Sequence, residues 1–242
     1  MKGIILAGGE GTRLYPLTKI TSKQLLPVYN KPMVFYPLET LLKAGIKEIL
    51  IIIAPNHADD FLKLLGSGKN FGAKFTYEIQ DKPEGLAQAF IIGEDFIGRD
   101  NVTLILGDNI FEHNFSKAIK NFKSGGHVFA KEVPDPERFG VVKFNEKGQA
   151  IKIVEKPRKF LSKYALMGLY IYDNKVSKVA KSLRPSKRGE LEVTDVSDWY
   201  LKRGELKVDV IDGEWLDAGT FDSLLRASNW AKNTVEKLSK IR

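Results

Sequence analysis

Three short, continuous apolar runs constrain the fold of this chain most strongly. They lack the alternation of a strand with one face in water, so they are typical of strands buried on both faces. The runs are Ile4–Leu6, Ile49–Ile53 and Val102–Leu106. Helical patterns separate them, and these lie from Pro32 to Gly45, over Ala58–Leu65 and after Gly85. Strand, helix and strand in this order predict a parallel sheet with right-handed crossovers, which is an α/β fold.

The second half of the chain, after about residue 130, changes to an antiparallel pattern. "FGVVKFNEKGQAIKIVEKP" predicts two strands around a turn at Glu146–Gly148, and "YALMGLYIYD" predicts another strand. Further helices are expected over Asn174–Leu183, Val193–Arg203 and Phe221–Lys237. No repeat and no low-complexity linker divides the sequence. We therefore expect one domain, residues 1–242, with a mostly parallel mixed sheet flanked by helices and an antiparallel excursion.

Composition removes several classes of protein. No apolar run among the 242 residues approaches the roughly 20 needed to span a bilayer, and no signal-peptide pattern is present. Cysteine is absent, which excludes disulfides, thiolate catalysis and iron–sulfur clusters and fits a cytoplasmic protein. The net charge of +8 is not gathered into one block, and no nucleic-acid-binding motif accompanies it. Neither nucleic acid nor a membrane is expected as a partner.

A glycine-rich loop follows the first strand, in "LAGGEGTRL". Glycines let backbone N–H groups approach an anion closely, and nearby cations add fixed charge, which together suit a phosphate chain at the carboxyl edge of a parallel sheet. The residues concerned are Gly8, Gly9, Gly11, Thr12, Arg13 and Lys23. Two familiar phosphate motifs are absent, because Arg13 stands where a P-loop has glycine and Leu14 where the dinucleotide motif has its third glycine. A structural turn is the alternative, and Arg13, Lys23 and Gln24 favour a nucleotide.

An ordered series of motifs resembles the sugar-phosphate nucleotidylyltransferase family. "LAGGEGTRLYPLT…SKQLLPVYNKPM" looks like its signature, and the other motifs recur in the family's order over essentially residues 1–230: "QDKPEGLAQAF", "LGDNIF", "DPERFGVV", "EKP", "YALMGLYIYD", "RGELEVTD" and "WLDAGT". The resemblance implies a Rossmann-like nucleotidyltransferase fold. It also implies an enzyme that joins a nucleoside triphosphate to a sugar 1-phosphate, with release of pyrophosphate, by in-line attack of the sugar phosphate on the α-phosphorus. Homo-oligomers are compatible with it.

The branch that the sequence resembles most uses dTTP and glucose 1-phosphate, commonly for rhamnose precursor synthesis. Uracil and thymine share an imide edge and differ by one methyl group, which discriminates by about 1–3 kcal/mol, so dTTP is expected to be preferred and UTP to be usable. A UTP-dependent enzyme is one alternative, although that branch typically has glutamate in place of Gln24. A non-catalytic nucleotide sensor on the same fold, or a nucleic-acid-binding protein with steep salt dependence, are the others.

The resemblance assigns a role to each motif residue. The glycine loop with Thr12 would wrap the triphosphate, Arg13 would balance the leaving pyrophosphate and Lys23 would hold the phosphates in line. The residues that would bind the nucleotide are Gly8, Gly9, Gly11, Thr12, Gln24, Gln80, Gly85 and Asp108, where the glutamine amides read the base. Asp108 and Asp217 would also bind Mg²⁺. For Asp108, a helix cap or turn is the alternative.

The sugar phosphate would bind in about residues 131–230, and the nucleotide in about residues 1–130. The sugar residues are Gly140, Glu155, Lys156 and Leu166, with Lys156 also contacting the reacting phosphate. A surface ion pair is the alternative for Glu155 and Lys156. Trp215 is expected in the core, with a role in shaping the site as the alternative. No chemistry is assigned to the three histidines or to Glu190, Glu192 and Asp195.

Two departures from the family pattern are visible. Met167 replaces a small hydroxyl residue, which predicts a more apolar pocket edge. The sequence also ends at Arg242, short of a helical segment that carries an allosteric nucleotide site and part of a subunit interface in the common bacterial form. We expect catalysis without that form of feedback.

Overall fold

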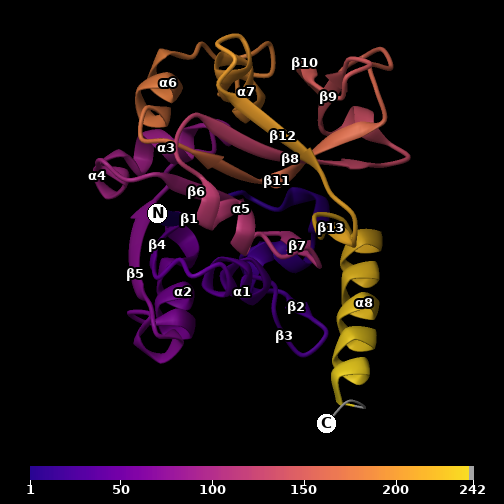
Figure 1. Cartoon of the computed structure of the whole chain (residues 1–242). Helices are drawn as coiled ribbons and strands as arrows, with labels where there is room; N and C mark the ends of the chain where they lie inside the picture. Colours follow the sequence, from indigo (N-terminus) through magenta and orange to yellow (C-terminus); the bar gives the residue numbers. More distant parts are fainter. Residues whose placement is uncertain (240–242) are drawn as a thin grey trace.

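A mixed sheet forms the centre of the molecule in the computed structural model, which describes the backbone of residues 1–239 and the side chains of residues 1–235 (Figure 1). Within these residues the sheet has nine strands. They are β1 (Lys2–Ala7), β4 (Glu48–Ile53), β5 (Lys74–Ile79), β6 (Val102–Leu106), β8 (Gly126–Glu132), β9 (Gly140–Phe144), β10 (Ala150–Glu155), β11 (Tyr164–Tyr172) and β12 (Leu206–Val210). Their order is β10-β9-β11-β6-β1-β4-β5, and β8 pairs with both β11 and β12.

Strands β6, β1, β4 and β5 run parallel, as the three apolar runs predicted. β1 lies between β4 and β6, so the chain leaves its carboxyl end at the point where the strand order reverses. In open α/β sheets this switch point is where ligands bind, because the connections diverge and leave a crevice. The glycine-rich loop begins there.

The second half adds antiparallel pairs, which confirms the predicted excursion. β11 runs antiparallel to β6, β8 and β9, and β9 and β10 form the predicted hairpin around Glu146–Gly148. β8 begins at Gly126, before the predicted change of pattern at about residue 130. Neither β8, nor its partner β12, nor β5 was predicted from the sequence. These three strands mix charged residues and glycine with apolar ones, so their pattern alone is weak.

Helices cover both faces of the sheet and give it two core layers. On one face pack α3 (Gln88–Ile92), α6 (Val176–Ser182) and α7 (Val193–Leu201). On the other pack α1 (Phe35–Lys43), α2 (Ala58–Leu65) and α5 (Ser116–Asn121). The short α4 (Glu94–Ile97) follows α3. Continuous burial on both faces explains why the parallel strands carry uninterrupted apolar runs.

Two small ribbons and a long helix lie beside the sheet. The ribbons pair β2 (Pro27–Val28) with β3 (Lys31–Pro32) and β7 (Asn109–Phe111) with β13 (Trp215–Asp217). The helix, α8 (Phe221–Ser239), packs its alanine-rich side against β2 and extends away from the sheet (Figure 1). The helix predicted to start at Pro32 therefore starts at Phe35, because Pro32 belongs to the tight β2–β3 hairpin, where Tyr29 has φ 58°.

Candidate active site

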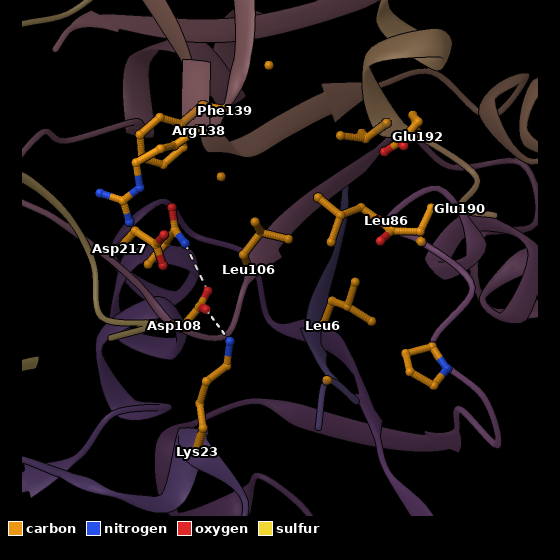
Figure 2. Close-up of a pocket in the computed structure, with 18 of the residues that line it drawn as sticks. Leu6, Lys23, Leu86, Leu106, Asp108, Arg138, Phe139, Glu190, Glu192 and Asp217 are labelled. Atoms are coloured by element: carbon orange, nitrogen blue, oxygen red, sulfur yellow. Dashed lines mark hydrogen bonds and ion pairs between the residues drawn. The ribbon is translucent and has the colours of Figure 1, made fainter. Parts of the chain in front are cut away.

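A cavity of about 700 Å³ opens at the carboxyl ends of β1 and β6 and is closed by β9, β10 and β11 from the second half of the chain. Figure 2 shows Lys23, Asp108 and Asp217 on one side of it and Glu190 and Glu192 on the other. All the sequence-predicted site residues but one line this cavity: Gly9, Gly11, Thr12, Arg13, Lys23, Gln24, Gln80, Gly85, Asp108, Gly140, Glu155, Lys156, Leu166 and Asp217. The two halves of the chain thus meet in a single pocket.

Gly8 is the predicted residue that does not line the cavity. It is buried, and a Cβ built on it would overlap the side-chain amide of Gln80. Its smallness therefore gives Gln80 room to lie against the loop. Gly11, by contrast, adopts φ 67°, a left-handed conformation that favours glycine, at the start of the short helical turn that carries Thr12 and Arg13.

Lys23 and Arg13 direct their charges at the two aspartates. Lys23 forms an ion pair with Oδ2 of Asp108 in the interior of the cavity. A Cβ built on Gly219 would lie 2.9 Å from Nη2 of Arg13 and 3.0 Å from Oδ1 of Asp217, so this guanidinium and this carboxylate converge on the same glycine. Lys23 is therefore already paired with a carboxylate, and Arg13 lies near Asp217 without an ion pair to it.

The β7–β13 ribbon brings Asp108 and Asp217 together. Asp217 lies opposite Asn109, and the backbone N–H of Ala218 donates to the carbonyl of Asp108 at 2.9 Å. Burial, reinforced by the Asp108 charge, raises the pKa of Asp217 to about 6, although Lys23, Arg13 and Arg138 oppose the rise. Burial acts most strongly on Asp108 and would raise its pKa, but the Lys23 ammonium together with hydrogen bonds from Asn109 and the backbone holds that pKa below its usual range. Of the alternative roles for Asp108, the helix cap is excluded because a strand begins at Asn109, whereas Asp108 does lie in the turn between β6 and β7.

The two glutamines are buried, line the cavity and each have one amide atom without a hydrogen-bond partner among the described residues. Oε1 of Gln24 accepts a hydrogen bond from Ser22 at 2.6 Å, and Nε2 of Gln80 donates to Gln88 at 2.6 Å. Among the described residues, Nε2 of Gln24 and Oε1 of Gln80 have no hydrogen-bond partner. One donor and one acceptor therefore remain for a ligand.

The second half of the chain supplies a carboxylate and a lysine. Oε2 of Glu155 accepts from the Thr194 hydroxyl at 3.2 Å, and its Oε1 lies 3.9 Å from Nζ of Lys156, which has φ 39°. Burial and the charge of Glu192 raise the pKa of Glu155. Glu155 lies opposite Gly140 in the β9–β10 hairpin. Both charged side chains line the cavity, so the pair is not simply a surface ion pair.

Alternation along β11 decides which of its side chains reach the cavity. Leu166, Gly168 and Tyr170 line it, whereas Met167 is buried in the core layer that holds α1 and α2. The prediction that Met167 makes the pocket edge more apolar is therefore wrong, because this side chain points to the opposite face of the sheet.

Several cavity residues were missed by sequence reasoning. Arg138, Glu190 and Glu192 line the cavity and were given no role. Trp215 both packs against a core layer, as expected, and lines the cavity, which was its alternative role. All lie inside the recurring motifs, which is the signal that would have found them. None of the three histidines lines it.

Residues 1–239 contain no helix long and apolar enough to cross a membrane. Over the same described part of the chain, no group of three or more histidine, aspartate or glutamate side chains is placed to hold a metal ion. A metal at the Asp108–Asp217 pair would therefore take its remaining ligands from water and substrate, as Mg²⁺ commonly does.

Comparison with known proteins agrees with this geometry. A family model described as "Nucleotidyl transferase" matches residues 2–234. Curated glucose-1-phosphate thymidylyltransferases from Neisseria meningitidis and Mycolicibacterium smegmatis are 52% and 53% identical to the chain, with 100% and 98% of this chain and 85% and 83% of theirs covered. A Bacillus anthracis crystal structure named for the same activity, in complex with sucrose, has a TM-score of 0.91 at 49% identity, covering 96% and 95% of the two chains. UDP-glucose pyrophosphorylase bound to UDP-glucose has a TM-score of 0.83 at 25% identity, with 96% of this chain and 98% of that chain covered.

Proposed function

The chain belongs to the nucleotidyl transferase family, and on that premise we propose that it transfers the thymidylyl group of dTTP to glucose 1-phosphate, giving dTDP-glucose and pyrophosphate. The observation that carries the proposal is the single cavity in which the cationic glycine loop and two aspartates face the Glu155–Lys156 pair. Relatives about half identical over the whole chain carry this activity in their names. The absence of cysteine fits a reaction in the cytoplasm.

The nucleotide occupies the half of the cavity built by about residues 1–130. Backbone N–H groups of the loop around Gly9 and Gly11 wrap the triphosphate, because the glycines leave its path open. Arg13 neutralises the pyrophosphate that leaves. Lys23 leaves Asp108 and pairs with the phosphates instead. It can do so because Asp108 and the phosphates lie in the same cavity.

The base lies against the two buried glutamines. A thymine imide edge presents an N–H between two carbonyl oxygens, which matches the acceptor Oε1 of Gln80 and the donor Nε2 of Gln24. Gly85, where φ is 111°, brings the backbone close to the same ligand. Uracil offers the same edge, so UTP is a slower substrate that lacks only the methyl contact.

Asp108 and Asp217 would hold Mg²⁺, the cation that the reaction needs beside the phosphates. The raised pKa of Asp217 reflects, after burial, repulsion from the Asp108 carboxylate, and a divalent cation relieves that repulsion. Two carboxylates with water and phosphate oxygens suit the oxygen shell that Mg²⁺ prefers. When bound, the ion supplies neutralisation of charge on the reacting phosphates.

The sugar phosphate occupies the half built by about residues 131–230. Glu155 accepts hydrogen bonds from sugar hydroxyls, Leu166 lies against the ring and Gly140 allows close backbone approach. Lys156 contacts the phosphate that reacts. An oxygen of this phosphate attacks the α-phosphorus in line as the bond to the β-phosphate oxygen breaks. The chain positions both groups and forms no covalent intermediate.

Pyrophosphate release tests the proposal. Each of dTTP, UTP, GTP, CTP and ATP is crossed with the 1-phosphates of glucose, galactose, mannose and N-acetylglucosamine, with and without Mg²⁺. The expected result is Mg²⁺-dependent release that is fastest with dTTP and glucose 1-phosphate. Silence in every combination would overturn the enzyme proposal and favour a nucleotide sensor, and a preference for UTP would move the chain to the uridylyl branch.

A further inference from the structure

Asn109 and Trp215 hold one oxygen of the Asp108 carboxylate. The indole Nε1–H of Trp215 donates to Oδ1 of Asn109 at 2.7 Å, and Nδ2 of Asn109 donates to Oδ1 of Asp108 at 2.9 Å. Lys23 donates to the other oxygen, Oδ2. The two carboxylate oxygens therefore have separate partners, one of them a neutral hydrogen-bonded chain that begins at Trp215, 106 residues after Asn109 in the sequence.

The indole fixes which way the asparagine amide points. An indole N–H only donates, so it requires the amide oxygen of Asn109, and the NH₂ group must then face Asp108. This amide is buried, and Gly168 leaves room for it, since a Cβ there would lie 2.6 Å from Cγ of Asn109. Strands β7, β13 and β11 thus confine one side chain that touches the carboxylate.

We propose that Asn109 and Trp215 are positioning residues for the nucleotidylyl transfer, an inference that rests on the proposed function. They hold Oδ1 of Asp108 in place, so that Oδ2 is the oxygen that changes partner when the substrates bind. Trp215 acts through Asn109, because its N–H reaches the amide and not the carboxylate. Its ring also contacts Phe139 at 5.0 Å between centroids, a packing role that phenylalanine retains.

Turnover measurements separate the hydrogen-bond chain from packing. Trp215→Phe keeps a ring and removes the donor, and we expect kcat to fall about tenfold while both KM values stay within about twofold. Asn109→Ala lowers kcat further, and the double variant is no slower than Asn109→Ala alone, because the indole has no other route to Asp108. Trp230→Phe, on α8, is the matched control and retains wild-type kcat. Losses that add in the double variant, or that appear in KM instead of kcat, would overturn the proposal.

A spectroscopic readout tests the chain without turnover. In a ¹H–¹⁵N spectrum, the indole signal of Trp215 is the one missing from Trp215→Phe. Asn109→Ala should move it while the signals of Trp199 and Trp230 stay. Asn109→Asp keeps the acceptor for the indole but loses the donor to Asp108, so the signal should stay downfield while kcat falls. If the Trp215 indole signal does not move in Asn109→Ala, the positioning role of Asn109 and Trp215 is overturned and the proposed function is not affected. A wild-type protein that turns over no substrate overturns the proposed function, and the positioning role with it.

Discussion

The carboxylates of Asp108 and Asp217 approach each other because Asp217 pairs with Asn109 across the β7–β13 ribbon. Their mutual repulsion adds to burial in raising the pKa of Asp217, while Lys23 holds the pKa of Asp108 down. Lys23 thus neutralises Asp108, whereas Asp217 is left to be neutralised by a cation or a proton. This asymmetry underlies the first three predictions.

Replacing Asp217 by asparagine should remove most turnover and leave the fold intact. The substitution deletes one of two carboxylates proposed to bind the metal, and loss of such a charged group is expected to lower kcat by at least about 100-fold. Pyrophosphate release and thermal unfolding would be measured together. Asp212→Asn, exposed on the loop before β13, should behave as the wild type. Near-normal turnover in Asp217→Asn would show that the metal assignment is wrong.

The pH dependence of stability should carry the signature of Asp217. Its pKa in the folded protein, about 6, lies above the ordinary value of 3.8, so the folded state holds the proton more tightly. Its contribution to the free energy of unfolding is therefore full below pH 4 and is lost as pH rises through 6, by up to about 3 kcal/mol. Urea unfolding at pH 4 and pH 7 should show that the free energy of unfolding of Asp217→Asn, relative to the wild type, is higher at pH 7 than at pH 4. An equal difference at both pH values contradicts this.

Lys23→Met should destabilise the substrate-free protein. It leaves the buried Asp108 carboxylate without its ion-pair partner, which costs about 3 kcal/mol at pH 7. Because the pKa of Asp108 is depressed, this contribution is full above the ordinary value of 3.8 and is lost as pH falls through the depressed pKa and the carboxyl takes up a proton. When Lys23→Met is combined with Asp108→Asn, most of the lost free energy of unfolding should be recovered, as measured by urea unfolding. Lys19→Met, which is exposed, serves as control; a similar loss there would count against the ion pair.

Gln80→Leu should weaken dTTP and UTP alike. The amide reads the edge that thymine and uracil share, so KM should rise about tenfold for each nucleotide while their ratio stays constant. Steady-state kinetics with both nucleotides measures this. Gln149→Leu, on the exposed β9–β10 turn, is the control. A changed dTTP-to-UTP ratio would mean that Gln80 lies near the methyl group instead.

Gly140→Ala should impair the sugar side selectively. A Cβ at this position would overlap the methyl group of Thr194 and lie 3.2 Å from Oε2 of Glu155, so it displaces the carboxylate proposed to hold the sugar. KM for glucose 1-phosphate is expected to rise at least about tenfold with KM for dTTP unchanged. Gly148→Asn, in the open turn of the same hairpin, is the matched control, since asparagine tolerates its φ of 73°. Equal effects on both substrates would contradict the division of the cavity.

The sequence predicted much of the site because its motifs resemble those of a known family and each motif is local. The glycine loop and the motifs "LGDN", "EKP" and "WLDAG" each place their residues near a strand end, and almost all of these residues line one cavity. Prediction failed where a neighbour from another element decides the outcome. Gly8 packs against Gln80, Met167 faces the opposite core layer, and Pro32 lies in a hairpin whose partner strand precedes it.

The sequence by itself determined the parallel strands and the chemical groups available, because hydrophobic period and turn residues act over a few neighbouring positions. Only the tertiary structure decided that Trp215 reaches Asn109 and that Asp217 faces Asp108. Those contacts depend on the pairing of two three-residue strands that are too short to be read from periodicity. They form because the sheet and both core layers bring distant parts of the chain to the same edge.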